Sequence, residues 1–305
     1  MVFFIKVNDI LTAGLCATAF AFLLYFIIYN RESRVARMFS ALLACVFIVY
    51  LMDLLLTNVR DLGRSIAPAS EGAPAAAALL LRLQWLGIAF TPVLYLEFAR
   101  AIRLSVLEDH YPDWFRPFGL ALSVIVVILA WWTDWVVYDG EFTAGAPHMR
   151  PGPLFYPFAG LFVLSIIEGL REIWAARSRC YTRAARRRMT YLLAGFVAPA
   201  LGVFPYLLFI GWPSQLPDIF LWVFLLLSNI VIAVLLLLVA YGTAFIGVLT
   251  PERVVKHRFV RFLLRGPVAA LLALVAFYAG SGLERALFGS DNLNGEMHFP
   301  FSALH

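Results

Sequence analysis

The chain has 305 residues, of which 62% are apolar and only 14% are charged. Soluble domains are about half apolar and a quarter charged, so this composition excludes an ordinary soluble enzyme, a disordered chain and a disulfide-framed secreted domain. The net charge of +5 comes from basic residues gathered in short loops, which is a signature of membrane topology and argues against a nucleic-acid partner.

Apolar blocks of about 20 residues, the length that crosses a bilayer, follow one another along the chain. They predict an all-α membrane protein, a seven-transmembrane helical bundle with an eighth C-terminal membrane segment. The seven helices are expected over residues 10–29, 38–57, 75–99, 117–135, 153–174, 189–211 and 219–242. The eighth block, Pro267–Leu283, is barely long enough to span, so it either crosses or lies re-entrant or at the interface.

Lysine and arginine are unevenly distributed between the predicted loops. The loops after the first, third, fifth and seventh helices hold eighteen of these residues, whereas the alternate loops hold three. Because basic loops stay in the cytoplasm, this bias predicts an N-terminus outside and odd-numbered loops inside. We expect a multi-pass protein of the bacterial cytoplasmic (inner) membrane.

The residues required for several kinds of catalysis and cofactor binding do not occur at suitable positions in this sequence. Both lysines, Lys6 and Lys256, fall outside the apolar blocks, which excludes a retinal Schiff base. All five histidines fall in predicted loops or the tail, which argues against a haem held between two helices. No zinc-protease helix, nucleophile elbow or phosphate-binding loop occurs. We expect no enzymatic activity, cofactor or metal.

Two ionisable residues lie deep in predicted helices, where charges are costly and point to function. Asp53 is placed about 7 Å, and Arg82 about 10 Å, below the outer edge of the bilayer, at 1.5 Å per residue. The matching depths predict an Asp53–Arg82 ion pair between neighbouring helices, with Gln84 and Tyr50 close by. Alternatively, Arg82 begins its helix and extends its side chain to the interface.

Other polar residues in the apolar blocks have simpler predicted roles. Glu97 and Glu168 each have an arginine three residues later, Arg100 and Arg171, a spacing that pairs the charges on one helix surface. Asn229 lies near the middle of the seventh helix, where an amide hydrogen-bonds a neighbouring helix or a ligand. Our candidate ligand-binding residues are Asp53, Arg82, Gln84, Tyr50 and Asn229.

Two loops stand out by composition. The segment 177–188 (RSRCYTRAARRR) should lie against anionic headgroups or dock a cytoplasmic partner. The outer loop, residues 131–158, combines charged residues and aromatics with a Pro-Gly-Pro turn. It either covers an outward-facing pocket or is a rigid connector. The predicted headgroup or partner contacts are Arg183, Arg186, Arg187, Arg188 and Arg258.

Three stretches carry a family resemblance: LRLQWLGIAFTPVLYLEFA at 81–99, Trp132–Asp134 followed by PGPLFYPFAGL at 151–161, and RRRMTYLLAGFVAPALGVFPYLL at 186–208. With the N-out topology, they resemble the seven-transmembrane N-terminal sensory module of bacterial histidine kinases, over roughly residues 1–245. The stretch 240–267 resembles the segment that leads on to the signalling domains in such kinases. Two departures stand out: WVVYDG replaces the family's histidine region, and no phosphoacceptor helix or ATP-binding box follows.

The resemblance implies a division of the chain and a function. Residues 1–249 would form the sensory-type domain, 250–266 a basic cytoplasmic connector, and 267–305 the eighth segment and tail. The implied function is a non-catalytic membrane sensory module that binds a small or lipophilic signal and passes a helix-packing change to a cytoplasmic partner such as a histidine kinase. The alternative is an accessory or structural subunit of a larger integral membrane complex, held by other membrane subunits.

Overall fold

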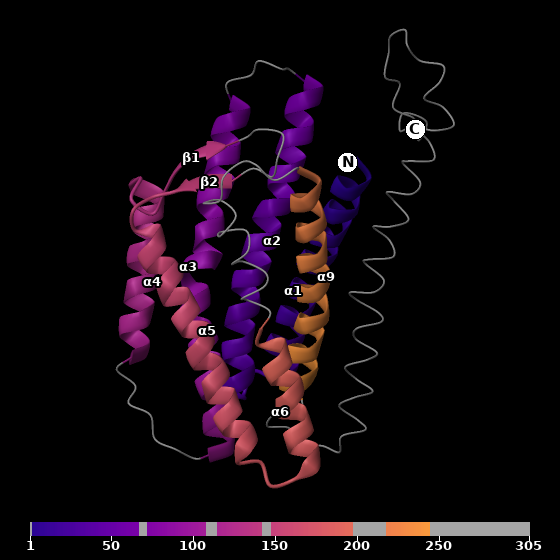
Figure 1. Cartoon of the computed structure of the whole chain (residues 1–305), viewed down its shortest axis with the longest axis vertical. Helices are drawn as coiled ribbons and strands as arrows, with labels where there is room; N and C mark the ends of the chain where they lie inside the picture. The colour runs from indigo at the N-terminus through magenta and orange to yellow at the C-terminus, as the bar shows by residue number, and fades with distance from the viewer. Residues whose placement is uncertain (1, 67–71, 108–114, 142–147, 198–217, 245–305) are drawn as a thin grey trace, which may run out of the picture.

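The computed structural model describes residues 2–66, 72–107, 115–141, 148–197 and 218–244, which are mostly helical (Figure 1). Its helices and strands, in chain order, are α1 (Val2–Tyr29), α2 (Arg34–Ile66), α3 (Gly72–Leu107), α4 (Phe115–Trp132), β1 (Val137–Glu141), β2 (His148–Pro151), α5 (Phe155–Ser178), α6 (Arg183–Gly195) and α9 (Asp218–Ala244).

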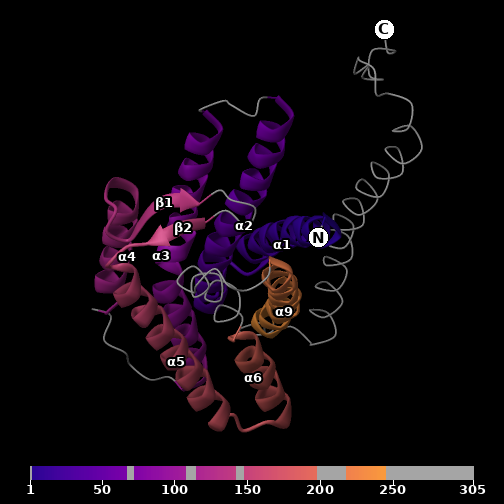
Figure 2. The same ribbon diagram turned by 45° about the horizontal axis from the view of Figure 1, so that its top comes forward.

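The helices form a bundle in which most of them run along the long axis of the molecule (Figures 1 and 2). Helix α3 packs against α2, α4 and α5, α1 packs against α2 and α9, and α6 packs against α5 and α9. We call the end of the bundle at which α1 begins and α2 ends the outer end, and the opposite end the inner end. The strands lie at the outer end beside α3.

Four helices contain stretches long and apolar enough to cross a membrane. At 1.5 Å per residue, even the shortest of them spans about 29 Å, close to the thickness of the bilayer core. Helix α5 is not among them because Glu168, Arg171 and Glu172 lie in its inner half. The helical class is confirmed, while the seven spans and the eighth segment stay predictions. The four stretches are Lys6–Tyr29, Arg34–Leu56, Ala77–Val106 and Leu225–Thr243.

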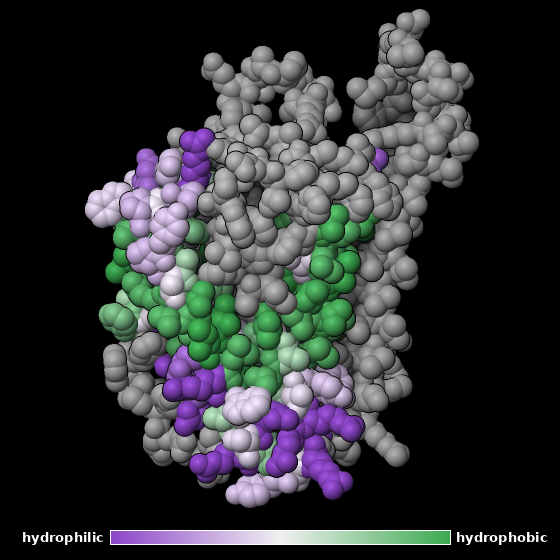
Figure 3. Space-filling view, in the orientation of Figure 1, coloured by the Kyte–Doolittle hydropathy of each residue, from purple (hydrophilic) through white to green (hydrophobic). Residues whose placement is uncertain are grey.

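The surface shown in Figure 3 has an apolar band between two polar zones. Large apolar side chains are exposed on helices that pack only on one face, for example Leu164 and Ile167 on α5 and Leu227 on α9. A soluble monomer rarely exposes so continuous an apolar surface, whereas lipid chains cover one at no cost. The polar zone at the inner end includes the exposed arginines of α5 and α6.

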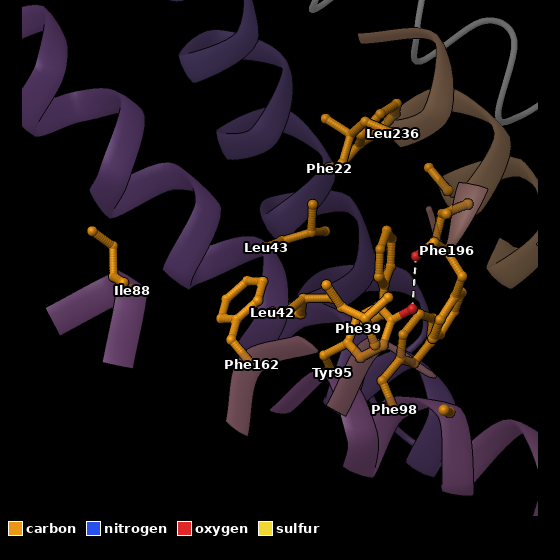
Figure 4. Packing of buried hydrophobic residues seen from close by; sticks show 14 of the residues in the cluster. Phe22, Phe39, Leu42, Leu43, Ile88, Tyr95, Phe98, Phe162, Phe196 and Leu236 are labelled. Carbon is orange, nitrogen blue, oxygen red and sulfur yellow. Dashed lines mark hydrogen bonds between the residues drawn. The ribbon is translucent and has the colours of Figure 1, made fainter. Parts of the chain in front are cut away.

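The core at the inner half of the bundle is aromatic (Figure 4). Phe26 of α1 contacts Phe39 of α2 edge to face, and Phe39 stacks on Phe98 of α3 at 5.1 Å between ring centroids. Phe98 in turn stacks at 5.0 Å on Phe196, the residue after α6. These rings bury large apolar areas and favour offset contacts, so the series fixes four separate chain segments against one another.

The outer loop contains an element that the sequence analysis did not predict, an antiparallel hairpin of β1 and β2. The register of the hairpin shifts between Tyr138 and Gly140. In the sequence, the strands are too short for an alternating pattern to stand out between the long apolar blocks. The ladder extends beyond the strands, because Gly152 N–H donates to the Val136 carbonyl and Leu154 N–H donates to the Trp135 carbonyl. These bonds favour the rigid-connector interpretation over a movable cover.

Several helices extend beyond their predicted bounds, and at the start of α6 the structure shows why. This helix begins at Arg183, six residues before the predicted start, because the Thr182 side chain caps it by accepting a bond from Ala185 N–H. Arginine is a good helix former, so the basic run is helical and the α5–α6 connection is short. The rest of the predicted sixth helix from residue 198, the connector 250–266 and the eighth segment lie outside the described residues.

Candidate functional site

The structure brings together two of the predicted site residues, Tyr50 and Asn229, which are 179 residues apart in sequence. The Tyr50 hydroxyl of α2 donates to Oδ1 of Asn229 on α9 at 3.2 Å. Nδ2 of Asn229 donates to Oδ1 of Asn8 on α1 at 2.9 Å. One amide therefore joins three helices, within stretches whose other residues are almost all apolar.

Asn8, which sequence reasoning missed, is 7% exposed and lies near the start of α1. Thr12, one turn further on, is 2% exposed, and the spacing of four places both side chains on one face of the helix. We call Asn8, Thr12, Tyr50 and Asn229 the outer polar cluster. The signal in the sequence was this pair of polar residues, four apart, at the head of an apolar block.

Two of the three remaining candidates, Asp53 and Gln84, lie close to Tyr50 in the bundle. Asp53 is half-buried on α2, three residues after Tyr50 and therefore on the same side of that helix. Gln84 of α3 points toward α2, where its Nε2 donates to the Val49 carbonyl at 3.4 Å. Both residues border the α2 segment that holds Tyr50.

Arg82 has a different acidic partner from the one predicted. Its guanidinium donates to the Trp131 carbonyl and forms a 3.4 Å ion pair with Asp134, not with Asp53. The reason is rotational: Gln84 faces α2, and two residues earlier on a helix lie about 200° away, so Arg82 faces α4. Depth alone matched Asp53 with Arg82, but the two side chains lie on different faces of the bundle. The sequence analysis did not identify Asp134 as the partner because this residue, which is 73% exposed, lies in a loop and not in a predicted helix.

Charged residues at the inner end form pairs within and between helices. The predicted local pairs are present, with 3.2 Å between Arg100 and Glu97 and 2.7 Å between Arg171 and Glu168. A third pair joins α3 to α5, with 2.6 Å between Arg103 and Glu172. The Glu172 side chain is 1% exposed and the Arg103 side chain 23% exposed, so the carboxylate of this pair is buried between the two helices.

The basic corner between α5 and α6 is exposed at the inner end. Arg183, Arg186 and Arg187 are exposed, whereas Arg188 is half-buried. Arg186 donates to the Cys180 carbonyl at 3.2 Å. Burial raises the pKa of the Cys180 thiol, and the nearby guanidinium groups partly oppose this. The corner is suited to binding anions; the fifth predicted contact, Arg258, lies outside the described residues.

Aromatic groups beside the basic corner are arranged as at a membrane interface. The Arg177 guanidinium lies 5.4 Å from the centroid of the exposed Trp174 ring, and its Nε donates to Thr190 Oγ1 of α6 at 2.9 Å. Tyr181 is fully exposed between the two helices. Aromatics and arginines gathered at one level of a bundle are typical of the headgroup region.

Helix α6 connects α3 with α9. The Tyr95 hydroxyl of α3 donates to the Phe196 carbonyl at 2.7 Å, which supplies a donor to a helix-end carbonyl that has no partner within the helix (Figure 4). On the other side of α6, Leu192 packs into a notch at Gly242 of α9, where an added Cβ would lie 2.6 Å from Leu192 Cγ. Helix α6 and the residue that follows it therefore contact both α9 and α3.

Among the described residues, no group of three His, Cys, Asp or Glu side chains is arranged to hold a metal ion. Comparisons with protein-family models, with curated proteins and with solved structures find no match. The function is therefore inferred from the residues themselves, among which the outer polar cluster is the site of most specific geometry.

Proposed function

We propose that the chain is a non-catalytic sensory module of the bacterial cytoplasmic membrane, in which a small or lipophilic signal changes the packing of α9 and a cytoplasmic partner such as a histidine kinase reads the change. The proposal rests chiefly on the hydrogen-bonded series Tyr50–Asn229–Asn8, which ties α9 to α1 and α2. In an apolar surrounding, these few bonds help to specify the position of α9 because few other polar groups lie in the same apolar stretches.

The inner half of the bundle supplies a route from this cluster to the cytoplasmic face. Helix α9 packs along α1 and then along α6, and α6 is bonded to α3 through Tyr95 and Phe196. A signal shifts such a system only if it binds one packing more tightly than the other. Breaking or replacing the bonds of Asn229 changes the relative energies of two positions of α9.

The topology that completes this proposal is a seven-span bundle with its N-terminus outside. The arginine bias predicts it, and the distribution of side chains supports it: exposed arginines gather at the inner end, below the apolar band (Figure 3). In this orientation the outer polar cluster faces the outer leaflet, and the basic corner Arg183–Arg188 meets anionic headgroups or the partner.

The test is a distance measurement between α6 and α9 in the full chain. Spin labels at Thr190 and Val234, both exposed, are introduced after replacing the native cysteines, and the protein is placed in lipid nanodiscs. We expect Asn229→Leu to shift or broaden the distance distribution relative to the otherwise unchanged labelled protein. The matched control is Ser228→Ala, which removes a neighbouring polar group about 100° around the same helix.

Identical distributions for all three proteins would contradict the proposal, because the position of α9 would then not depend on the cluster. Purification in mild detergent provides a second readout. A histidine kinase recovered with the wild type, and lost with Arg186→Glu, supports the sensory function. Stoichiometric recovery of other integral membrane subunits instead supports the accessory-subunit alternative.

A further inference from the structure

One buried hydroxyl in the outer polar cluster makes no hydrogen bond with any described residue, and it is the Oγ1 of Thr12. Several other serines and threonines in the apolar helices behave differently, although the buried Thr243 hydroxyl of α9 likewise has no partner among the described residues. Thr18 and Thr91 donate to the carbonyl four residues earlier, both at 2.7 Å, and Ser40 does so at 2.9 Å. Burying a hydroxyl without a hydrogen-bond partner is unfavourable, so the unpaired hydroxyl of Thr12 needs an explanation.

Thr12 lies on the face of α1 that carries Asn8. Side chains on a helix lean toward its N-terminus, so Thr12 leans toward Asn8, one turn earlier on the same face. Asn8 already accepts the amide of Asn229, which itself accepts the Tyr50 hydroxyl. Since Thr12 is 2% exposed, its hydroxyl is shielded from bulk solvent on the face of α1 that carries the three-helix hydrogen-bonded series.

We propose that the outer polar cluster is a binding site for the uncharged, hydrogen-bonding headgroup of an amphiphile, an alkyl alcohol or amide, with Thr12 as the group that bonds it. The four side chains are amides and hydroxyls, which both donate and accept hydrogen bonds. None of the four carries a charge, and the carboxylate of Asp53, one turn from Tyr50, already has an interaction of its own, so a charged headgroup would be costly to desolvate between these apolar helices. The apolar tail lies against apolar side chains of α9 beside Asn229, such as the exposed Ile230.

This inference deepens the proposed function and rests on it, because it names the class of signal. A bound hydroxyl would compete with the side-chain partners of Asn229 and so favour the second position of α9. Binding and movement are nevertheless measured separately, and each has its own readout.

The experiment uses photolabelling of the full chain in phosphatidylcholine nanodiscs. The probe is a ten-carbon alcohol bearing an alkyl diazirine, compared with the corresponding ammonium and carboxylate probes. We expect the alcohol to label α1 and α9 peptides near the cluster saturably and to be displaced by unlabelled decanol. Thr12→Val should raise the half-saturating concentration at least fivefold, the loss expected for one hydrogen bond.

Two variants guard against a general packing effect. Thr12→Ser keeps the hydroxyl and should retain the wild-type half-saturation. Thr18→Val, on the same helix, removes a hydroxyl that already bonds Gly14 and should also leave it unchanged. Equal labelling of wild type and Thr12→Val, or equal labelling by the charged probes, would overturn the site. Labelling as expected with no change in the α6–α9 distance would leave the site standing and refute the sensory function.

Discussion

Arg82 and Trp131 bond each other reciprocally across α3 and α4. The Arg82 guanidinium donates to the Trp131 backbone carbonyl, and the Trp131 indole N–H donates to the Arg82 carbonyl at 2.9 Å. Each residue thus supplies a side-chain donor and a backbone acceptor. The result is a clamp between two helices at the outer end, just before the chain enters the β1–β2 hairpin.

The clamp should depend on the indole N–H more than on the nearby acid. We expect Trp131→Phe to lower the free energy of unfolding by about 1 kcal/mol, the typical net value of one hydrogen bond. Asp134→Asn should change it by less than about 0.5 kcal/mol, because the exposed carboxylate is screened by solvent. Thermal unfolding in dodecyl maltoside measures both. The neighbouring Trp132, 73% exposed, provides the control Trp132→Phe; an equal loss there would contradict the clamp.

Gly169 and Gly160 on α5 form a matched pair. A Cβ at Gly169 would lie 2.4 Å from Cε1 of the buried Tyr95 ring, whereas at Gly160 it would meet nothing within 4 Å. We expect Gly169→Ala to destabilise the protein by about 1–3 kcal/mol through overpacking. Gly160→Ala should be neutral or stabilising by up to about 1 kcal/mol through helix propensity. Unfolding midpoints that fall equally for the two variants would show that α5 does not pack on Tyr95.

The buried ion pair between Arg103 and Glu172 should outweigh the exposed ones. Removing one partner of a buried pair leaves an uncompensated charge, so we expect Glu172→Gln to lower the free energy of unfolding by about 3 kcal/mol. Glu168→Gln should have little effect, since the partner Arg171 is 71% exposed. The exchange Arg103→Glu with Glu172→Arg should restore part of the loss. Denaturation in sodium dodecyl sulfate compares the four proteins, and equal stabilities would refute the pair's role.

Tyr95→Phe removes only the hydroxyl that bonds the Phe196 carbonyl. We expect a loss of about 1 kcal/mol, together with faster amide hydrogen exchange at the end of α6, where the freed carbonyl loosens the last turn. The outer ends of α1 and α2 should exchange at unchanged rates. The control is Tyr191→Phe, which removes the hydroxyl of a tyrosine on α6 that is 37% exposed. Unchanged exchange at residues 192–197 in Tyr95→Phe would show that the bond does not hold this end of α6.

The sequence predicted those features that depend on local periodicity. The helices α1, α2, α3 and α9 are read from continuous apolar runs, and the pairs of Glu97 and Glu168 follow from a spacing of three. The site was partly predicted: Tyr50 and Asn229 were named as candidates, and the structure shows them in contact.

What the sequence did not reveal depends on how helices are rotated about their axes. Continuously apolar helices show no polar face from which to read that rotation, so Arg82 was assigned to the wrong neighbour. The same uncertainty hid Arg103–Glu172 and the bond between Asn8 and Asn229. The hairpin was missed because strands of four or five residues give too short a pattern beside apolar blocks.

The notch at Gly242 has a mechanical consequence for any motion of α9. Sliding by one turn would bring a bulkier residue, Leu238, under Leu192, so tilting about the notch is the easier movement. Asn229 lies thirteen residues from Gly242, a lever arm of about 20 Å. A tilt of about 5° at this fulcrum would move the amide by nearly 2 Å, on the order of what separates a made hydrogen bond from a broken one.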